Sequence, residues 1–257
     1  MVKSLFLLLT LCVSSSLWGK SLVVLGHFDS FGKAPFNNST VVAKEIASRL
    51  SGDSEIEISL CPLSTSFDKA FLEMENCVRS APTPPALILG LGEAFCGMKI
   101  ETMGRNLDNT FGPDNDGVER KNQRIIENAA DVLGINAPVA HMYCSLTQKE
   151  QKNFSISSNP GSFVCNNLIF QYLHHYPKEN FSFIHVPSHN CKNLEFKNQQ
   201  NIPKIITMIR GGVRAQSAER VPTTKKELRA RSQEMTDSCL KRFYRSIKGS
   251  DERGYWK

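Results

Sequence analysis

The sequence lacks several features that would assign it quickly to a class of protein. No apolar run approaches the roughly 20 residues that a membrane-spanning helix needs. No two cysteines are separated by only two residues, the spacing typical of structural zinc sites. The chain has no internal repeat, which excludes a repeat architecture. We therefore expect a globular chain without a membrane span or a structural zinc.

The first 19 residues have the pattern of a secretory signal peptide. Lys3 supplies one positive charge, residues 5–13 form a short apolar run, and small residues follow up to Gly19. Cleavage after Ser16 or Gly19 fits this pattern. The alternative, a membrane anchor, needs a longer apolar run. We predict an exported mature chain that is periplasmic or secreted.

The cysteine count is in keeping with export to an oxidising compartment. Without Cys12 in the signal peptide, the chain keeps seven cysteines: Cys61, Cys77, Cys96, Cys144, Cys165, Cys191 and Cys239. An odd number leaves at least one thiol unpaired, and up to three disulfides with a free Cys165 satisfy the count. The pairing cannot be read from the sequence.

Short apolar segments alternate with helical patterns along the first part of the chain. Residues 21–26, 56–60 and 86–90 are predicted as strands, and residues 40–50 and 66–79 as helices. Such alternation predicts an α/β fold with a mainly parallel sheet and helices on both of its faces. Binding sites in such folds collect at the loops beyond the carboxyl ends of the strands.

The C-terminal segment differs from the rest of the chain in charge. Residues 210–257 contain 13 Lys and Arg against 6 Asp and Glu, so they carry +7 and the rest carries −1. Thr224 and Glu227 form a capping-box pattern, and we predict a basic amphipathic helix over residues 225–248. One interpretation is a docked helix with a solvated basic face. The other is contact with an anionic surface, either membrane lipid or nucleic acid. No aromatic interleaving supports base recognition, so we expect no sequence-specific nucleic-acid binding.

Three side chains are candidates for a nucleophilic site. The polar run 157–161 leads into an apolar helical pattern, which places Cys165 near a helix N-terminus, where thiols ionise readily. His185 lies in the short, mainly apolar segment 183–187, and Glu101 directly follows Ile100. Each also has a structural explanation, because a Cys in an apolar helix is usually a core residue. In a chain of this length, one Cys, one His and one Glu are weak evidence for a catalytic site unless the fold brings them together.

Four motifs occur in one order between residues 22 and 188. They are Phe28-Asp29-Ser30-Phe31-Gly32 with Asn37-Asn38-Ser39, Glu101 ahead of Asn106 and Pro113-Asp114-Asn115, Pro160-Gly161-Ser162-Phe163-Val164-Cys165-Asn166, and Phe183-Ile184-His185-Val186-Pro187. This order resembles that of the pyroglutamyl peptidase I family, which are cysteine peptidases that remove N-terminal pyroglutamate. The resemblance implies a single-domain, three-layer α/β/α sandwich over residues 20–209. The basic extension over residues 210–257 has no counterpart in the family's pattern.

The resemblance also implies an activity. Cys165, His185 and Glu101 would form a catalytic triad that works through an acyl-enzyme, with no metal or organic cofactor. The substrates would be peptides with an N-terminal pyroglutamate. Many members of the family form homo-oligomers, so the resemblance adds that expectation.

The resemblance further implies the residues of a substrate pocket. Phe28 and Phe31 would bracket the flat lactam ring. Asn37 and Phe163, from the same motifs, are the other expected substrate-binding residues.

Several residues around this expected pocket depart from the family's motifs. Ser30 replaces a proline, Thr102 replaces an arginine, and the usual Gly-Gly-Arg run is replaced by Phe95-Cys96-Gly97. The candidate catalytic residues therefore match the family's motifs, whereas residues expected in the pocket walls differ from them. A second interpretation follows, in which the chain is an inactive or respecified relative that acts as an envelope binding protein through its basic tail.

Overall fold

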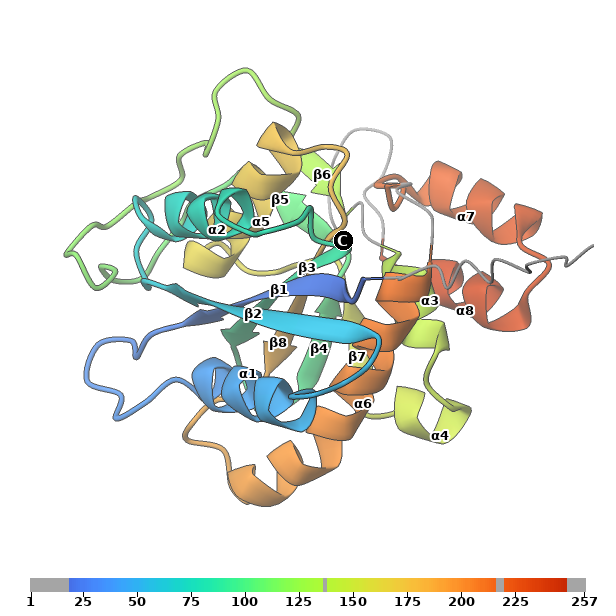
Figure 1. Cartoon of the computed structure of the whole chain (residues 1–257). Coiled ribbons are helices and arrows are strands. Elements are labelled where there is room, and N and C mark those ends of the chain that lie inside the picture. Colours follow the sequence, from blue (N-terminus) through green and yellow to red (C-terminus); the bar gives the residue numbers. More distant parts are fainter. Residues whose placement is uncertain (1–18, 136–137, 216–219, 249–257) are drawn as a thin grey trace, which may run out of the picture.

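The computed structural model describes residues 19–135, 138–215 and 220–248 (Figure 1). The expected signal peptide lies outside the described residues except for Gly19. Within the described ranges, no helix is both long enough and apolar enough to cross a membrane.

A six-stranded sheet forms the centre of the molecule, with the strand order β2-β1-β3-β8-β4-β7 (Figure 1). Its neighbouring strands are parallel, except that β4 runs antiparallel to β8. A second, two-stranded sheet pairs β5 with β6. The strands are β1 (Ser21–Phe28), β2 (Ile56–Leu63), β3 (Leu87–Glu93), β4 (Met98–Glu101), β5 (Met103–Arg105), β6 (Val132–Gly134), β7 (Phe154–Ser157) and β8 (Phe181–Val186).

Helices cover both faces of the large sheet. α1 and α6 pack together on one face, and α2 and α5 pack together on the other (Figure 1). The helices are α1 (Asn38–Arg49), α2 (Ala70–Arg79), α3 (Val139–Cys144), α4 (Gln148–Gln151), α5 (Val164–His175), α6 (Leu194–Arg214), α7 (Lys225–Glu234) and α8 (Ser238–Ser246). The predicted α/β fold with a mainly parallel sheet between helical layers is confirmed.

The central strands are buried along almost their whole length because helices cover both of their faces. β8 is buried at every residue, and β1 and β3 are buried except at one end. This is the pattern expected of parallel strands between two helical layers. The carboxyl ends of these three strands lie side by side, and the loops that follow them form one edge of the molecule.

The C-terminal extension contains two helices where the sequence predicted one over residues 225–248. α7 begins with the predicted capping box, but it ends at Glu234. The Asp237 side chain then accepts the backbone N–H groups of Cys239 and Leu240, which is an N-cap that starts α8 in a new direction. The expected start of the extension, residue 210, lies inside α6.

The two-helix C-terminal hairpin (α7 and α8) is docked on the α/β core. Leu228 and Phe243 are buried, and the Phe243 ring lies 5.5 Å from Tyr143 of α3. A disulfide joins Cys239 of α8 to Cys144 of α3. The hairpin lies at the opposite end of the molecule from the loop between β1 and α1 (Figure 1).

Three disulfides form, and Cys165 is free. The pairs are Cys61–Cys77, Cys96–Cys191 and Cys144–Cys239. This outcome agrees with the count that the sequence allowed, and it is consistent with an oxidising compartment.

Candidate active site

The nucleophile loop brings Cys165 to the start of α5. Gly161 has a φ of 88°, a left-handed conformation that suits glycine and turns the chain toward the helix. Cys165 is the second residue of α5 and is partly exposed. The first N–H groups of a helix have no carbonyl one turn earlier to bond, so this position favours negative charge.

The register of the sheet brings His185 and Glu101 together. Lys99 of β4 lies opposite His185 of β8, so Glu101 is two residues further along β4 on the same face and diagonal to His185. Gly92 of β3 lies beside His185 on the other side. A Cβ atom at Gly92 would lie only 2.8 Å from the Cys165 Sγ atom, so the absence of a side chain there lets the sulfur approach the sheet.

The three side chains form a connected polar chain in a buried setting. The Nδ1–H of His185 donates to Oε1 of Glu101 at 2.8 Å. Burial alone would lower the pKa of His185, but hydrogen bonding and charge attraction involving Cys165 and Glu101 raise it to about 9. The imidazole is therefore held in its protonated form at neutral pH.

Glu101 is fully buried and contacts this histidine. Its second oxygen, Oε2, has no hydrogen-bond partner among the described residues. A buried carboxylate with one unsatisfied oxygen is costly unless a positive charge lies next to it. The imidazolium of His185 is the positive charge in contact with it.

The residues expected to bind substrate line one pocket together with Cys165. Its volume is about 230 Å³. The lining residues are Phe28, Phe31, Ala34, Phe36, Asn37, Thr65, Glu93, Phe163, Val164, Cys165, Ser188 and His189. The structure thus brings Phe28, Phe31, Asn37 and Phe163 to the same place as the candidate nucleophile.

One wall of the pocket is aromatic. The Phe163 ring lies 5.1 Å from Phe31 and 5.3 Å from Phe67, in edge-to-face contacts with both. Phe28 packs instead toward Phe183, at 6.5 Å. Phe28 and Phe31 thus each lie against a different neighbouring ring. The role of Phe67 was missed, because its segment carries no motif.

Asn37 is largely occupied in holding its own loop. Its side-chain N–H donates to the Asp29 carbonyl at 2.9 Å. Its side-chain oxygen accepts the backbone N–H and the hydroxyl of Ser39, which caps α1. These contacts fix the loop that carries Phe31 and Phe36.

The Pro113-Asp114-Asn115 turn also forms hydrogen bonds with this loop. Asn115 accepts the Gly32 N–H at 3.0 Å and donates to the Ser30 carbonyl at 2.8 Å. Asp114 accepts the N–H of Phe67 at 2.8 Å. One turn thus holds the loop that carries Phe31, more than 80 residues away in sequence, and the segment of Phe67, 47 residues away.

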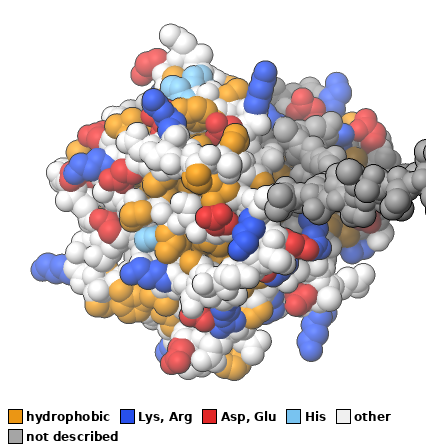
Figure 2. Space-filling model, in the orientation of Figure 1, with side chains coloured by type: hydrophobic (Ala, Val, Ile, Leu, Met, Phe, Trp, Pro, Cys, Tyr) orange, Lys and Arg blue, Asp and Glu red, His pale blue; other side chains and the backbone are white. Residues whose placement is uncertain are grey.

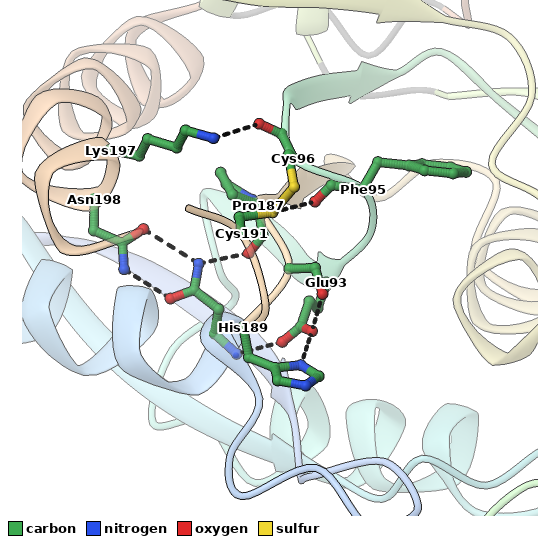
Figure 3. The surroundings of a disulfide bond; sticks show 10 residues. Glu93, Phe95, Cys96, Pro187, His189, Cys191, Lys197 and Asn198 are labelled. Atoms are coloured by element: carbon green, nitrogen blue, oxygen red, sulfur yellow. Dashed lines mark hydrogen bonds and ion pairs between the residues drawn. A yellow bond between two sulfur atoms is a disulfide. The ribbon is translucent and has the colours of Figure 1, made fainter. Parts of the chain in front are cut away.

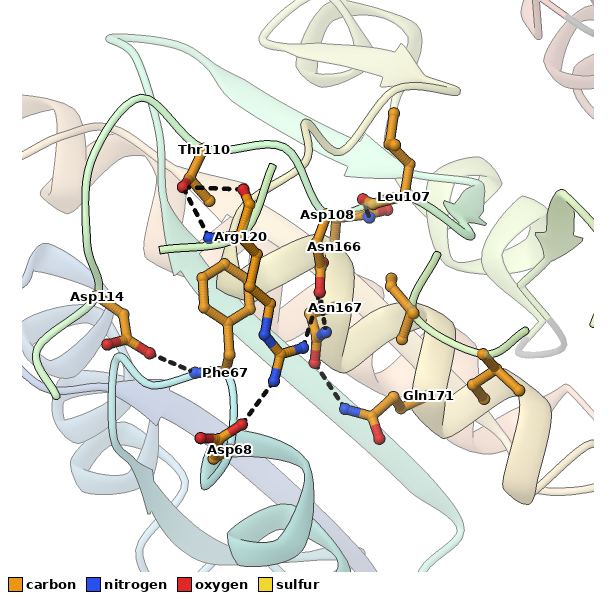
Figure 4. Close-up of polar contacts among 12 residues, drawn as sticks. Phe67, Asp68, Leu107, Asp108, Thr110, Asp114, Arg120, Asn166, Asn167 and Gln171 are labelled. Carbon is orange, nitrogen blue, oxygen red and sulfur yellow. Dashed lines mark hydrogen bonds and ion pairs between the residues drawn. The ribbon is translucent and has the colours of Figure 1, made fainter. Parts of the chain in front are cut away.

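A cluster around Arg120 joins the loop of residues 107–131 to the segment before α2 and, through Asp108, to α5 (Figure 4). Arg120 pairs with the buried Asp108 and with Asp68, and its guanidinium lies 4.7 Å from the Phe67 ring centroid. Asp108 also accepts from Asn167 of α5. Burial raises the pKa of Asp108, although the bonds from Arg120 and Asn167 offset part of that rise. The cluster holds Phe67 against the nucleophile helix.

A second wall of the pocket is polar, and no motif in the sequence pointed to it. Glu93 accepts hydrogen bonds from the Asn38 backbone, the Ser188 hydroxyl and the His189 ring (Figure 3). Burial alone would raise the pKa of Glu93, but hydrogen bonds from Asn38, His189 and Ser188 hold it below its usual value. The disulfide Cys96–Cys191 joins the two loops that carry these residues. The available signal was their position directly after β3 and β8.

One cluster of potential metal ligands occurs in the described part of the chain. The cluster with suitable spacing there consists of Cys144, Asp237 and Cys239. Its two sulfur atoms are joined in a disulfide, so they are not thiolate ligands.

A cysteine at a helix N-terminus, a protonated histidine and a buried carboxylate make the arrangement that cysteine hydrolases use. Here the arrangement lies at the edge of an α/β sheet where such folds place their sites.

Comparison with known proteins gives the family. The sequence pattern described as "Pyroglutamyl peptidase" matches residues 20–219, so the chain belongs to the pyroglutamyl peptidase family. A pyrrolidone-carboxylate peptidase of Streptococcus suis (strain 05ZYH33) is 28% identical over 171 residues, which are 64% of this chain and 77% of that protein. A pyrrolidone-carboxylate peptidase of Thermosipho africanus (strain TCF52B) is 25% identical over 191 residues, which are 71% of this chain and 88% of that protein.

Solved structures give the same fold. The pyroglutamyl peptidase I from Bacillus amyloliquefaciens superposes with a TM-score of 0.66 at 21% identity, covering 77% of this chain and 98% of that one. The pyrrolidone carboxyl peptidase from Fervidobacterium islandicum AW-1 gives a TM-score of 0.60 at 25% identity, covering 74% and 97%. The resemblance predicted from the four motifs is confirmed at the level of family and fold.

Proposed function

We propose that the mature chain is an exported cysteine exopeptidase that hydrolyses the amide bond after an N-terminal pyroglutamyl residue. The observation that carries this proposal is the contact of the buried pair His185 and Glu101 with Cys165, which lines an aromatic-walled pocket. Family membership supports it independently.

The proposed reaction begins with an ion pair. His185 holds a proton and faces Cys165 as a thiolate, while Glu101 orients the imidazole and stabilises its charge. The thiolate attacks the pyroglutamyl carbonyl carbon, and a tetrahedral oxyanion forms. The backbone N–H groups at the start of α5, including that of Cys165, are the donors available to this oxyanion.

The remaining steps use the same histidine. His185 gives its proton to the leaving amine, which departs and leaves a thioester between Cys165 and the pyroglutamyl group. His185, now neutral, takes a proton from an incoming water, which attacks the thioester. Pyroglutamate leaves, and the proton on His185 restores the ion pair.

The aromatic wall supports the choice of acyl group. A pyroglutamyl residue has a flat, neutral ring and no free amine, so it needs no charged partner in the pocket. Phe28, Phe31 and Phe163 offer flat apolar surface without a buried charge. Export is part of the proposal, supported by the signal-like residues 1–19 and the three disulfides.

The test is hydrolysis of pyroglutamyl-aminomethylcoumarin by residues 20–257, beside Cys165→Ala and Cys165→Ser. Glutamyl and prolyl amides serve as controls for specificity. We expect cleavage of the pyroglutamyl amide alone, lost in both variants while their melting temperatures stay close to that of the unchanged chain. No cleavage of any amide by a folded protein would reject the peptidase proposal.

A second candidate is a binding protein that its C-terminal hairpin holds to an anionic surface. Lys225, Arg229, Arg245 and Lys248 surround a hollow of about 520 Å³ between α7 and α8. On the face drawn in Figure 2, in contrast, basic and acidic side chains are interspersed. Co-sedimentation with vesicles containing phosphatidylglycerol, lost when these four residues become glutamine, would favour this candidate if the amide assay is silent.

A further inference from the structure

A groove leaves the pocket on its polar side and runs between α1 and α6. Its volume is about 750 Å³, within the roughly 300–1,000 Å³ of typical ligand sites. The lining residues are Phe36, Asn38, Val41, Lys44, Glu45, Ser48, Arg49, Leu194, Glu195, Asn198, Gln199 and Ile202. Phe36 lines both the pocket and this groove, so the two hollows share a boundary.

This boundary is held firmly in place. The backbone N–H of Asn38 donates to Glu93 at 2.6 Å, and its side chain donates to the Pro187 carbonyl at 2.7 Å. Asn38 and Asn198 also exchange side-chain hydrogen bonds, which join α1 to α6 at the groove floor (Figure 3). The Phe36 ring lies 5.9 Å from the His189 ring. The start of the groove is therefore built from residues bonded to the polar wall of the pocket.

The two ends of the pocket differ in what they can hold. Phe31, Phe67 and Phe163 pack together at the aromatic wall, which suits the flat acyl ring. Cys165 must lie at the scissile carbonyl, so the chain after that carbonyl has to leave on another side. Away from these rings the pocket is lined by Glu93, Ser188, His189 and Phe36, and Phe36 also lines the groove, so the groove is the adjoining hollow that can receive this part of the chain.

We propose that this groove binds the part of a peptide substrate that follows the scissile bond. The inference rests on the proposed function and adds the substrate class, which is peptides of several residues with an apolar side chain after the pyroglutamyl group. The occupant is the leaving peptide itself, held in an extended form along α1.

The dimensions and chemistry of the groove fit this occupant. Its α1 lining extends from Asn38 to Arg49, about 16 Å of helix, which matches about five residues of extended chain. Val41 is 43% exposed, and it lines the groove with Leu194, so the two offer apolar surface to a side chain of the peptide. Ser48 and Gln199 bring polar side chains for the peptide backbone.

The test compares substrates that share the acyl group and differ only beyond the scissile bond. Pyroglutamyl-aminomethylcoumarin, pyroglutamyl-alanine and pyroglutamyl-Ala-Leu-Ala-Ala-Ala are hydrolysed by the unchanged chain and by Val41→Asp. Leu72→Asp is the matched control, because Leu72 is a similarly exposed apolar residue, at 51%, on α2. We expect kcat/KM for the hexapeptide to exceed that for the dipeptide by roughly tenfold, the gain from burying one apolar side chain, mainly through KM.

In Val41→Asp this advantage of the hexapeptide should disappear, and in Leu72→Asp it should persist. Equal kcat/KM for both peptides, or equal losses in the two variants, would overturn the groove while cleavage of the coumarin amide keeps the peptidase proposal. No cleavage of any pyroglutamyl substrate would reject both. A dimer in analytical ultracentrifugation that Val41→Asp dissociates would assign the groove to a second copy of the chain and overturn the peptide.

Discussion

The two walls of the pocket are built in different ways. The aromatic wall consists of rings that contact one another, held from behind by hydrogen bonds of the Pro-Asp-Asn turn and by Arg120. The polar wall consists of Glu93 and its partners in the loop after β8, tied by the disulfide Cys96–Cys191. The comparison suggests a division of tasks, in which the aromatic wall selects the acyl group and the polar wall governs what leaves.

We predict the largest loss of activity from changes to Cys165, His185 and Glu101, the candidate catalytic residues that both walls adjoin. Glu101→Gln keeps a hydrogen-bond acceptor for His185 but removes the negative charge beside it. Loss of kcat/KM on the coumarin amide should be roughly 10⁴-fold, by analogy with the carboxylate-to-amide change in a serine-protease triad.

The pH profile of Glu101→Gln gives a second readout. The raised pKa of His185 keeps the imidazolium present up to about pH 9, so the activity of the unchanged chain should fall only above that pH. Removing the charge of Glu101 lowers this pKa, so the decline should begin at a lower pH. An unchanged alkaline limb would contradict the coupling between Glu101 and His185.

The Sγ atom of Cys165 can lie close to β3 because Gly92 has no side chain. In Gly92→Ala the new Cβ would meet Cys165 Sγ and the Phe183 ring, each at 2.8 Å. We expect roughly a hundredfold loss of kcat and destabilisation by about 1–3 kcal/mol.

Gly97→Ala is the control for Gly92→Ala, since a Cβ atom there meets nothing within 4 Å. Kinetics and thermal unfolding of both variants provide the measurement. Full activity of Gly92→Ala would show that the sulfur does not need this approach to the sheet.

The aromatic wall alone can be weakened through Phe31, which is 44% exposed. Phe31→Ala should raise KM for the coumarin amide by roughly tenfold, because ring contact with the acyl group is lost. It should change kcat and stability little. Phe111→Ala is the control, because Phe111 is fully exposed and does not line the pocket. A fall in kcat with unchanged KM would place Phe31 outside the acyl pocket.

The polar wall alone can be loosened by removing its disulfide. Cys96–Cys191 and Cys144–Cys239 both close 95 residues, so loss of either pair as serines should cost a similar free energy of unfolding, about 4 kcal/mol. Only the first pair lies beside the pocket. We expect a severalfold increase in KM for peptides from Cys96→Ser with Cys191→Ser, and none from Cys144→Ser with Cys239→Ser. Equal kinetic effects would remove the polar wall from the account.

The sequence predicted the parts of the molecule that local patterns encode. β1 and β3 were predictable because continuous apolar runs are typical of buried parallel strands, and β8 because its apolar residues alternate with other residues. The position of Cys165 followed from a polar turn before an apolar helix, and α5 begins there. The order of the four motifs then gave the family.

Other parts depend on contacts between distant segments and could not be predicted. The disulfide partners are separated by up to 95 residues, and nothing local selects them. The polar wall requires Glu93 and His189 to meet after β3 and β8 pair, and the sequence alone does not show that pairing. The single helix expected over residues 225–248 was wrong because the capping ability of Asp237 was overlooked.

The central claim is that Cys165 and His185 form an ion pair at the floor of the pocket, and alkylation of Cys165 tests it most directly. The rate of reaction with iodoacetamide should be measured from pH 5 to pH 10, with the modified residue identified by mass spectrometry. Our account predicts rapid alkylation of Cys165 that is nearly as fast at pH 6 as at pH 8, and slower alkylation at pH 6 in His185→Ala. A rate that rises only near pH 8.5, as for an ordinary thiol, or a Cys165 that does not react in the folded protein, would contradict it.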